Sequence, residues 1–423
     1  MVVSEVVGVG IFLSPATMVR TLGSLSGALI IWLALGLLSA AGALCYAELA
    51  SRFPRAGGGY AFLEEAYGAR VAFVYGWMAL LVMDPGLAAA LGIGLAQYLL
   101  ATLALPASLV TPVAIGALIV FGLLTLVGFE ASSRVIRWTA AAKLACVAVL
   151  VLAGAVRAVS HPVVASARSS HTITLAGIAA AVIAAFFAFG GWWDVGRMSE
   201  EVEDPRRTMP RALIAGVLLV AAIYALVSVA FVLVVPTAGA TSDEAFVLDV
   251  GVRLFGSAAG RLLALMVVVA VAGSLAAVLL GAPRLYVAMA RDGLFPERLV
   301  RFNESRGTSP GGTLIQVGLA CVLVALGTFN EILGYFVPGA VFFLGLSAAA
   351  ILVVPRATDE SRVFRAPLHP LPIALFLLFI AAILILFAAG QPRQTLLGAL
   401  VVALGIPISF VVIKRNPVGR QAL

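Results

Sequence analysis

The sequence predicts an all-α polytopic membrane protein of about twelve transmembrane helices, and composition, hydropathy and segment length together lead to this fold class. Of the 423 residues, 62% are hydrophobic and only 11% are charged, whereas a soluble domain carries roughly 25% charged residues. The mean hydropathy is +1.12. The apolar residues gather in stretches of the length needed to cross a hydrocarbon core of about 30 Å. We therefore expect a single membrane domain over residues 1–423.

Twelve apolar segments are expected, at 2–20, 25–49, 70–101, 109–129, 135–157, 172–199, 211–236, 256–290, 313–329, 331–354, 370–389 and 394–413. Twenty of the 27 basic residues, Arg197 among them, fall on the side of the N-terminus. Cytoplasmic loops carry such an excess, so both termini are predicted to be cytoplasmic in a multi-pass protein of the inner or plasma membrane. No cleavable signal peptide is expected, because the start lacks a basic region and a cleavage site.

Several function classes are disfavoured by the distribution of polar residues. The net charge is +7, but the basic residues form no patch with interleaved aromatics, so no nucleic-acid partner is expected. The three cysteines lie within apolar segments and the three histidines lack ligand spacing, so neither a disulfide nor a metal is predicted. With no nucleophile–base pair, we expect no enzyme and no cofactor.

The first segment is interrupted by Gly8 and Gly10. Glycine in a helix costs about 1 kcal/mol relative to alanine, and unpaired backbone groups find no water in lipid. Such a break is tolerated where it lines a cavity, which predicts a binding site, or where small residues allow close helix packing. The sequence alone leaves both interpretations open.

Two polar features follow in the second and third segments. The stretch from Arg52 to Tyr60 is rich in glycine and aromatics, which indicates either a re-entrant gate element or a short amphipathic interfacial helix. Asp84 precedes Pro85 and Gly86, a kink signal. We interpret Asp84 as a polar group turned to the bundle interior in preference to a substrate ligand.

Lys143 lies within the fifth apolar segment. A lysine at membrane depth costs roughly 2.5–3.5 kcal/mol on insertion scales and marks a functional site by default. The alternative is snorkelling toward the interface near Arg137. Six helical residues separate the two, about 9 Å at 1.5 Å per residue, which favours the functional interpretation.

The sixth segment breaks at Gly190 and Gly191, between aromatic residues that include Trp192. Glycine-interrupted segments at corresponding positions of two halves are the best sequence pointer to a transporter site. Two inverted repeats of five helices would bring the breaks together. Helix N-termini there suit a carboxylate, and exposed carbonyls suit an ammonium. The pattern predicts transport of a zwitterion.

A set of motifs occurs in order from residue 8 to about residue 310. They are Gly8-Val9-Gly10-Ile11-Phe12-Leu13-Ser14-Pro15, Cys45-Tyr46-Ala47-Glu48-Leu49 through Pro54 and Gly58-Gly59-Tyr60, Ala142-Lys143-Leu144, Phe187-Ala188-Phe189-Gly190-Gly191-Trp192 with Glu200-Glu201 and Pro210-Arg211-Ala212, and Arg284-Leu285-Tyr286 with Arg291-Asp292-Gly293-Leu294-Phe295-Pro296. Each motif alone is weak, whereas the set in this order is specific. With these motifs the chain resembles the amino acid–polyamine–organocation superfamily, in particular its L-type amino acid transporter branch.

The resemblance implies the bacterial leucine-transporter fold, with repeats at about 1–157 and 172–329 and two further helices at about 330–413. It implies substrate binding at the two breaks, by Gly8, Val9, Gly10, Ile11, Phe187, Ala188, Phe189 and Gly190. Phe187 matches an aromatic gate, and we assign Trp192 to the gate as well. Lys143 matches a lysine that replaces a sodium ion, with Ser274 as its polar neighbour. The first half-helix, with seven residues before Gly8, is expected to be shorter than in the family.

The predicted function is sodium-independent secondary transport of neutral, small to medium L-amino acids by alternating access, as an exchanger or a proton-coupled symporter. One alternative is a cationic amino acid or polyamine carrier, which needs an unpaired carboxylate from Asp84, Glu5 or Asp194. Another is a transporter-like sensor or partner subunit with little flux. The expected partners are the amino acid and membrane lipid. The oligomeric state is left open, and a monomer is compatible with the sequence.

Overall fold

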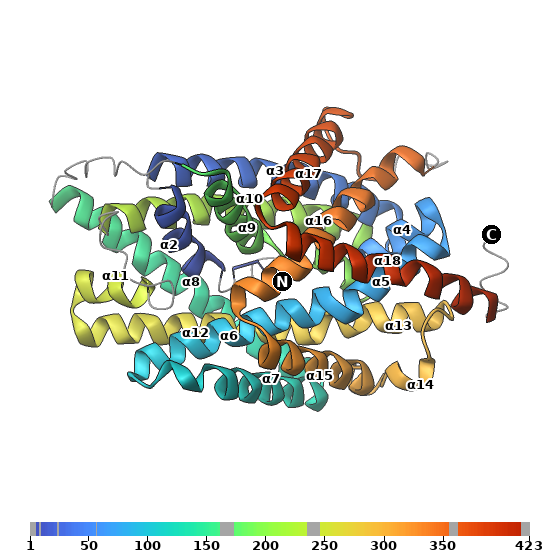
Figure 1. Cartoon of the computed structure of the whole chain (residues 1–423), viewed down its shortest axis with the longest axis horizontal. Coiled ribbons are helices and arrows are strands. Elements are labelled where there is room, and N and C mark those ends of the chain that lie inside the picture. Colours follow the sequence, from blue (N-terminus) through green and yellow to red (C-terminus); the bar gives the residue numbers. More distant parts are fainter. Residues whose placement is uncertain are drawn as a thin grey trace.

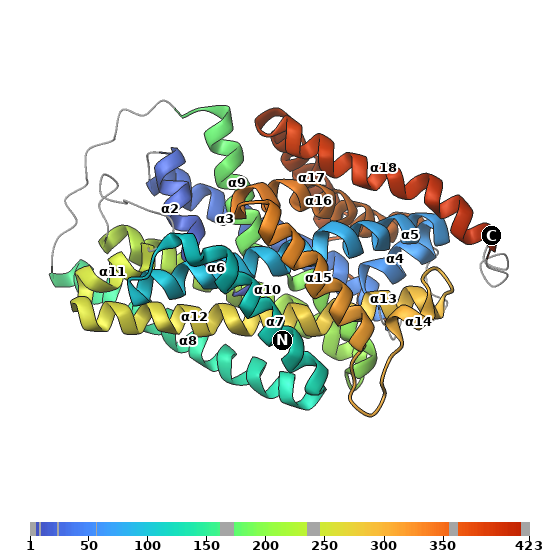
Figure 2. The same cartoon turned by 60° about the horizontal axis from the view of Figure 1, so that its bottom comes forward.

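The computed structural model describes residues 6–7, 10–22, 25–55, 57–160, 173–234, 246–354 and 363–415. These residues form helices, joined by turns and one isolated bridge between Asn303 and Thr308. The long helices lie side by side in one bundle (Figures 1 and 2). The all-α prediction is confirmed for this part of the chain.

Ten helical stretches in the described ranges are long and apolar enough to cross a membrane. They are Gly27–Arg52, Ala69–Leu103, Ala107–Val127, Phe129–Val156, Leu175–Arg197, Pro205–Ala230, Ser257–Arg291, Glu331–Val353, Leu371–Gly390 and Pro392–Ile413. Two further expected segments correspond to shorter helices, α2 (Gly10–Leu22) and α15 (Pro310–Leu326). The chain therefore has the helix content of a polytopic membrane protein, while the count of twelve spans and the inverted repeat stay predictions.

The remaining elements, in chain order, are α3 (Leu25–Arg52), α4 (Gly59–Tyr67), α5 (Ala69–Met78), the π-helix η1 (Ala79–Met83), α6 (Asp84–Leu103), the 3₁₀-helix η2 (Ala107–Leu109), α7 (Val110–Val127), α8 (Phe129–Ser160), α9 (Leu175–Phe189), the 3₁₀-helix η3 (Trp192–Glu201), α10 (Pro205–Val234), α11 (Phe246–Phe255), α12 (Ser257–Gly281), α13 (Pro283–Arg291), α14 (Glu297–Val300), α16 (Phe329–Val353), α17 (Leu371–Gly390) and α18 (Pro392–Arg415).

The sixth apolar segment is interrupted where the glycine pair predicts. Helix α9 ends at Phe189, and η3 begins at Trp192. Gly191 between them has φ of 103°, a left-handed conformation that glycine adopts without a Cβ penalty. The two halves of the segment therefore present a helix C-terminus and a helix N-terminus at the same break.

The third segment is locally irregular at its proline. The π-helix η1 directly precedes Asp84 and Pro85. Proline has no N–H to close the preceding turn, and a wider π-turn is one of the known ways to accommodate such a site in a helix. The kink signal in the sequence thus has its counterpart here.

One helix lies where only a linker was expected. Helix α11 occupies residues between the seventh and eighth apolar segments and packs on α12, α10 and α2. At ten residues it is too short to span a bilayer of about 20 helical residues. It covers one end of the bundle (Figure 1).

Around the breaks, α2 packs directly against α9, and both views show the two helices beside one another (Figures 1 and 2). Helices α3 and α10 pack against each other, and each also contacts α2. Helix α12 contacts α6, α8 and η3. Around the breaks, the interrupted segments are therefore enclosed by other helices.

Candidate functional site

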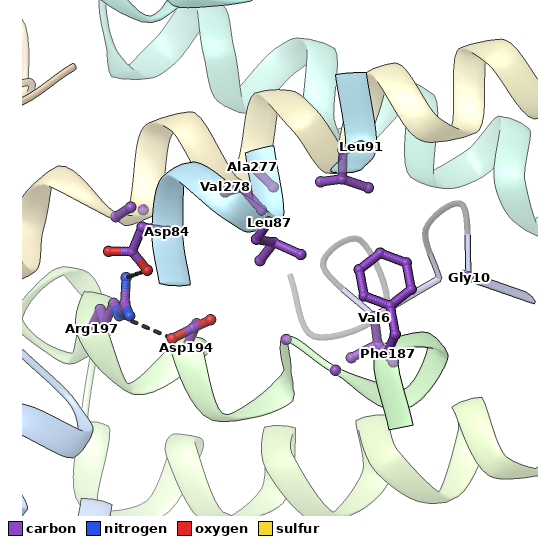
Figure 3. Close-up of a pocket in the computed structure, with 14 residues that line it drawn as sticks. Val6, Gly10, Asp84, Leu87, Leu91, Phe187, Asp194, Arg197, Ala277 and Val278 are labelled. Carbon is purple, nitrogen blue, oxygen red and sulfur yellow. Dashed lines mark hydrogen bonds and ion pairs between the residues drawn. The ribbon is translucent and has the colours of Figure 1, made fainter. Parts of the chain in front are cut away.

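A cavity lies at the two breaks (Figure 3). Its walls come from the first break, from α6, from the α9–η3 break and from the end of α12. The lining residues are Val6, Gly10, Asp84, Leu87, Leu91, Phe187, Gly190, Gly191, Asp194, Arg197, Ala277, Val278, Gly281 and Ala282.

The start of α2 lies directly against the end of α9. A Cβ atom added to Gly10 would stand 2.5 Å from the Cα atom of Ala188, closer than any real van der Waals contact. The hydroxyl of Ser14 donates a 2.7 Å hydrogen bond to the carbonyl of Ala184. Glycine at position 10 thus permits this contact, so close packing and cavity lining occur at the same residue.

Opposite helix ends meet at the cavity as a result. Helix α2 begins at Gly10 and α9 ends at Phe189. The first N–H groups of a helix and its last C=O groups have no intrahelical partner, and the dipole adds partial positive and negative charge to these ends. A ligand with a carboxylate and an ammonium matches this pair of helix ends.

Tyr224 of α10 connects both interrupted segments. Its buried hydroxyl lies 2.8 Å from the carbonyl oxygen of Val6 and 2.8 Å from that of Ala188. A phenol carries one proton, so it donates to one of these carbonyls at a time. Tyr98 of α6 donates a further hydrogen bond, 2.9 Å long, to the carbonyl of Phe12.

Aromatic contacts close the cavity beside Phe187. The Phe187 ring meets the ring of Phe329, the first residue of α16, edge to face with centroids 5.5 Å apart. Both Phe187 and Gly190 line the cavity. Phe329 was not recognised in the sequence, because nothing in the chain before α16 marks it as a partner of Phe187.

Two other aromatic site candidates do not line the cavity. Phe189 packs against Trp32 and Tyr224, with ring centroids 5.6 and 5.0 Å apart. Trp192 packs against Tyr46, with ring centroids 5.2 Å apart. Both residues are buried, yet neither is among the residues that line the cavity.

Lys143 of α8 is completely buried, at 0% exposure. Its Nζ atom donates a 2.7 Å hydrogen bond to the hydroxyl of Ser274 on α12, and that hydroxyl lies 3.4 Å from the carbonyl oxygen of Val7. The structure thus brings the two predicted coupling residues together beside the first break. Burial on this scale excludes snorkelling to the interface.

Charged residues gather at the other end of the cavity (Figure 3). The Nη1 atom of Arg197 lies 2.9 Å from Oδ1 of Asp84, whose Oδ2 accepts a 2.9 Å hydrogen bond from Tyr286. The Nε atom of Arg197 forms an ion pair of 3.0 Å with Asp194 Oδ1. Arg197, counted among the cytoplasmic charges in the sequence, is 2% exposed. Its side chain therefore lies inside the bundle and not in an exposed loop, because η3 carries it there.

The glycine-rich stretch after α3 covers this charged end. A Cβ atom on Gly58 would meet the backbone of Gly196 and Arg197 at 3.1 Å, so the turn lies directly on η3. Tyr60 of α4 donates a 2.8 Å hydrogen bond to Asp292, just beyond α13. The stretch is therefore neither a plain linker nor a loose interfacial helix, because its residues from Gly57 to Leu63 are buried in the bundle.

Glu64 lies on the outer part of the same covering element. Arg55 forms a 2.7 Å ion pair with Glu64. Burial raises the pKa of Glu64, and the charge of Asp292 raises it further, whereas Arg55 opposes the shift. The cover thus carries a carboxyl group that is protonated more readily than an ordinary glutamate.

The predicted substrate-binding residues divide into three groups. Gly8 and Val9 lie outside the described residues. Gly10, Phe187 and Gly190 line the cavity. The other three are buried behind it and do not line it: Ile11, Ala188 and Phe189. Among the described residues, no group of three or more His, Cys, Asp or Glu is placed to hold a metal ion.

Comparisons with known proteins agree with this architecture. The profile of the amino acid permease family matches residues 1–411. The serine/threonine exchanger SteT of Bacillus subtilis (strain 168) is 27% identical over 426 aligned positions, which cover 98% of this chain and 95% of that protein. The b(0,+)-type amino acid transporter 1 of Mus musculus is 29% identical over 390 positions, covering 90% and 79% of the two chains.

A third relative is the large neutral amino acids transporter small subunit 2 of Mus musculus, 27% identical over 429 positions, with 97% of this chain and 78% of that protein covered. The family profile spans nearly the whole chain, and the interrupted helices of the chain meet at a cavity. The chain belongs to the amino acid permease family, whose members are membrane transporters and not enzymes.

Proposed function

We propose that the protein is a sodium-independent secondary carrier for neutral, small to medium L-amino acids. It works by alternating access, as an amino acid exchanger or a proton-coupled symporter. The observation that carries the proposal is the meeting of the α2 N-terminus and the α9 C-terminus at one cavity. The α-carboxylate binds at the first of these helix ends and the α-ammonium at the second.

Lys143 supports independence from sodium. Its ammonium group is fully buried and hydrogen-bonded to Ser274, which in turn lies next to the carbonyl of Val7. A fixed cation at unwound carbonyls supplies the positive charge that a sodium ion would supply there. In a proton-coupled cycle the same group gains and loses the proton.

The balance of buried charge favours neutral substrates. The cavity is lined by Asp84, Asp194 and Arg197, and Lys143 adds a second cation beside the first break. These two carboxylates and two cations balance one another, so the site needs no net charge from the ligand. A cationic amino acid or polyamine would need an unpaired carboxylate, whereas Asp84 and Asp194 are both paired with Arg197. Glu5, the third candidate, lies outside the described residues.

The relatives support amino acids as the substrate class. One is named as a serine/threonine exchanger and another as a large neutral amino acids transporter. Together with the two breaks, they favour the inverted five-helix repeat with two additional helices, both termini in the cytoplasm and a place in the cell membrane. The name of the second relative includes "small subunit", which keeps a partner-dependent role as the alternative.

The test is uptake of radiolabelled amino acids into proteoliposomes. Uptake that requires internal amino acid indicates exchange, and uptake that follows a pH gradient without sodium indicates proton coupling. A requirement for sodium contradicts the assignment of Lys143. An absence of flux under every condition refutes the carrier proposal and favours the partner-subunit alternative.

A further inference from the structure

We propose that Asp194 recognises the side chain of the transported amino acid by accepting a hydrogen bond from it. The carrier then prefers small neutral amino acids with a hydroxyl or amide donor over aliphatic amino acids of the same shape. The inference rests on the proposed function and names the substrate class of the same site.

The two carboxylates at the charged end of the cavity differ in their bonding. Asp84 is 2% exposed, and its two oxygens accept hydrogen bonds from Arg197 and Tyr286. The Oδ1 atom of Asp194 lies 3.0 Å from Arg197 Nε, but the contact lacks hydrogen-bond geometry. The Asp194 side chain also keeps 17% of its surface exposed. Because Oδ1 is shielded from solvent, the acceptor that Asp194 offers a ligand is Oδ2, whereas both oxygens of Asp84 already accept a hydrogen bond.

This capacity is directed into the cavity. Asp194 is a lining residue, and Figure 3 places the three charged side chains at one end of the view, with Phe187 and Gly10 at the other. Asp194 lies in the first turn of η3, three positions after its N-cap residue Gly191, which is about 6 Å along the axis at 2.0 Å per residue of 3₁₀-helix. Helical side chains lean toward the helix N-terminus, which here is the break.

A substrate held at the breaks by its ammonium and carboxylate groups consequently extends its side chain from the break toward Asp194. A small side chain together with a hydrogen bond of about 3 Å spans this distance. The intervening walls are apolar and small, from Leu87 of α6 and from Ala277 and Val278 of α12. They offer no competing hydrogen-bond partner, so the donor of the substrate meets Asp194.

The site discriminates against aliphatic substrates because their side chains would leave the Asp194 carboxylate without a hydrogen-bond donor. Such a side chain would cover Asp194 without supplying a donor, and a buried carboxylate that loses a hydrogen-bond partner is costly. A site built around a hydrogen bond rejects the analogue that lacks it more strongly than an apolar pocket rejects a different size. A long cationic side chain is disfavoured, because Arg197 already occupies the other side of Asp194.

The test compares isosteric pairs in proteoliposomes that contain internal alanine. Serine is paired with 2-aminobutyrate, and threonine with valine. The wild type should transport the hydroxyl member of each pair with a kcat/KM about tenfold higher or more, as expected for a hydrogen bond to a charged group. Asp194→Leu should abolish this preference, and Asp194→Asn, which keeps one carbonyl acceptor, should reduce it. Gly116→Ala on α7, where an added Cβ meets nothing within 4 Å, should leave the ratio within each pair unchanged.

Both Asp194 substitutions leave Arg197 with one partner of opposite charge, Asp84. If Asp194→Leu does not fold, the isosteric Asp194→Asn variant and the substrate-induced thermal stabilisation of the wild type supply the same comparison. Equal transport of both members by the wild type overturns the inference, as does a preference that survives in Asp194→Leu or faster transport of lysine than of serine. The first two results would leave alanine exchange, and with it the proposed function, intact, whereas faster transport of lysine would also contradict the neutral substrate class. Failure of the wild type to take up any amino acid, with internal alanine or with a pH gradient, would instead refute the proposed function.

Discussion

The Nζ atom of Lys143 lies 2.7 Å from the Oγ atom of Ser274, although 131 residues separate the two in the chain. Their contact joins α8 to α12 beside the first break, where the carbonyl oxygen of Val7 lies 3.4 Å from the same hydroxyl. A buried cation is therefore connected to the interrupted backbone through one side chain. Movement of that backbone changes the environment of the ammonium group.

Replacing Lys143 with alanine should abolish transport or uncouple it from its driving gradient. The substitution removes a hydrogen bond of a charged group, worth about 1.5–3 kcal/mol, or roughly a 10- to 100-fold change in rate. Uptake into proteoliposomes measures the effect. Arg137→Ala provides the control, because Arg137 lies on the same helix with an exposed side chain. Normal kinetics of a well-folded Lys143→Ala protein would contradict the role of this lysine.

Gly10→Ala should separate α2 from α9. The new Cβ atom would lie 2.5 Å from backbone Cα of Ala188, so a helix must shift. We expect a loss of transport together with a lower unfolding temperature in detergent. The matched variant is Gly116→Ala on α7, where an added Cβ meets nothing within 4 Å, and helix propensity predicts a gain of roughly 0.5–1 kcal/mol. Unchanged transport in Gly10→Ala would show that the contact is not needed.

Phe187 and Phe329 form an edge-to-face pair and should act together to close the cavity. Aromatic pairs contribute about 0.5–1.5 kcal/mol beyond their area burial. Phe187→Leu and Phe329→Leu should each accelerate loss of preloaded amino acid from proteoliposomes. The double variant should show little additional loss, because the contact is already broken in either single variant. Fully additive effects would mean that the two rings act independently.

Acidification should stabilise the folded protein through Glu64 on α4, the helix that covers the charged end of the cavity. Burial and Asp292 raise the pKa of Glu64 in the folded protein, so the folded state binds more protons than the unfolded state above the ordinary glutamate pKa. Stability linked to Glu64 therefore rises as pH falls through the raised pKa. Glu64→Gln should flatten the increase of unfolding temperature as the pH falls toward the ordinary glutamate pKa, about 4.3. The comparison variant is Glu203→Gln, at an exposed position outside α4, and equal slopes in wild type and Glu64→Gln would disprove the linkage.

The helices and the interruption of the sixth segment were predictable because both depend on local sequence. Apolar runs define the helices, and Gly190 with Gly191 ends α9 where the pair occurs. Helix α11 was missed, since ten residues between two apolar segments are too few to give the length signal of a membrane span. The structure of Gly8 and Val9 lies outside the described residues, so their part in the first break stays a prediction.

The charged end of the cavity was only partly predictable. Asp84 was expected to face the bundle interior, and it is buried there. Its partner Arg197 is 113 residues away in the chain and occurs next to an acidic turn, the usual setting of a cytoplasmic arginine. Pairings of this kind depend on the tertiary packing of η3 against α12 and α3. Neither composition nor periodicity encodes them in a single sequence.

The Tyr224 hydroxyl has one proton for two carbonyl oxygens, those of Val6 and Ala188, each 2.8 Å away. As long as α10 travels with both interrupted segments, this shared bond survives the transport cycle unchanged. If the segments part, the proton must remain with one carbonyl, and the other needs a new donor. The ammonium group of an amino acid is such a donor, so an empty carrier would resist a separation that a loaded carrier permits. A single phenol would then tie the movement of the protein to the presence of its cargo.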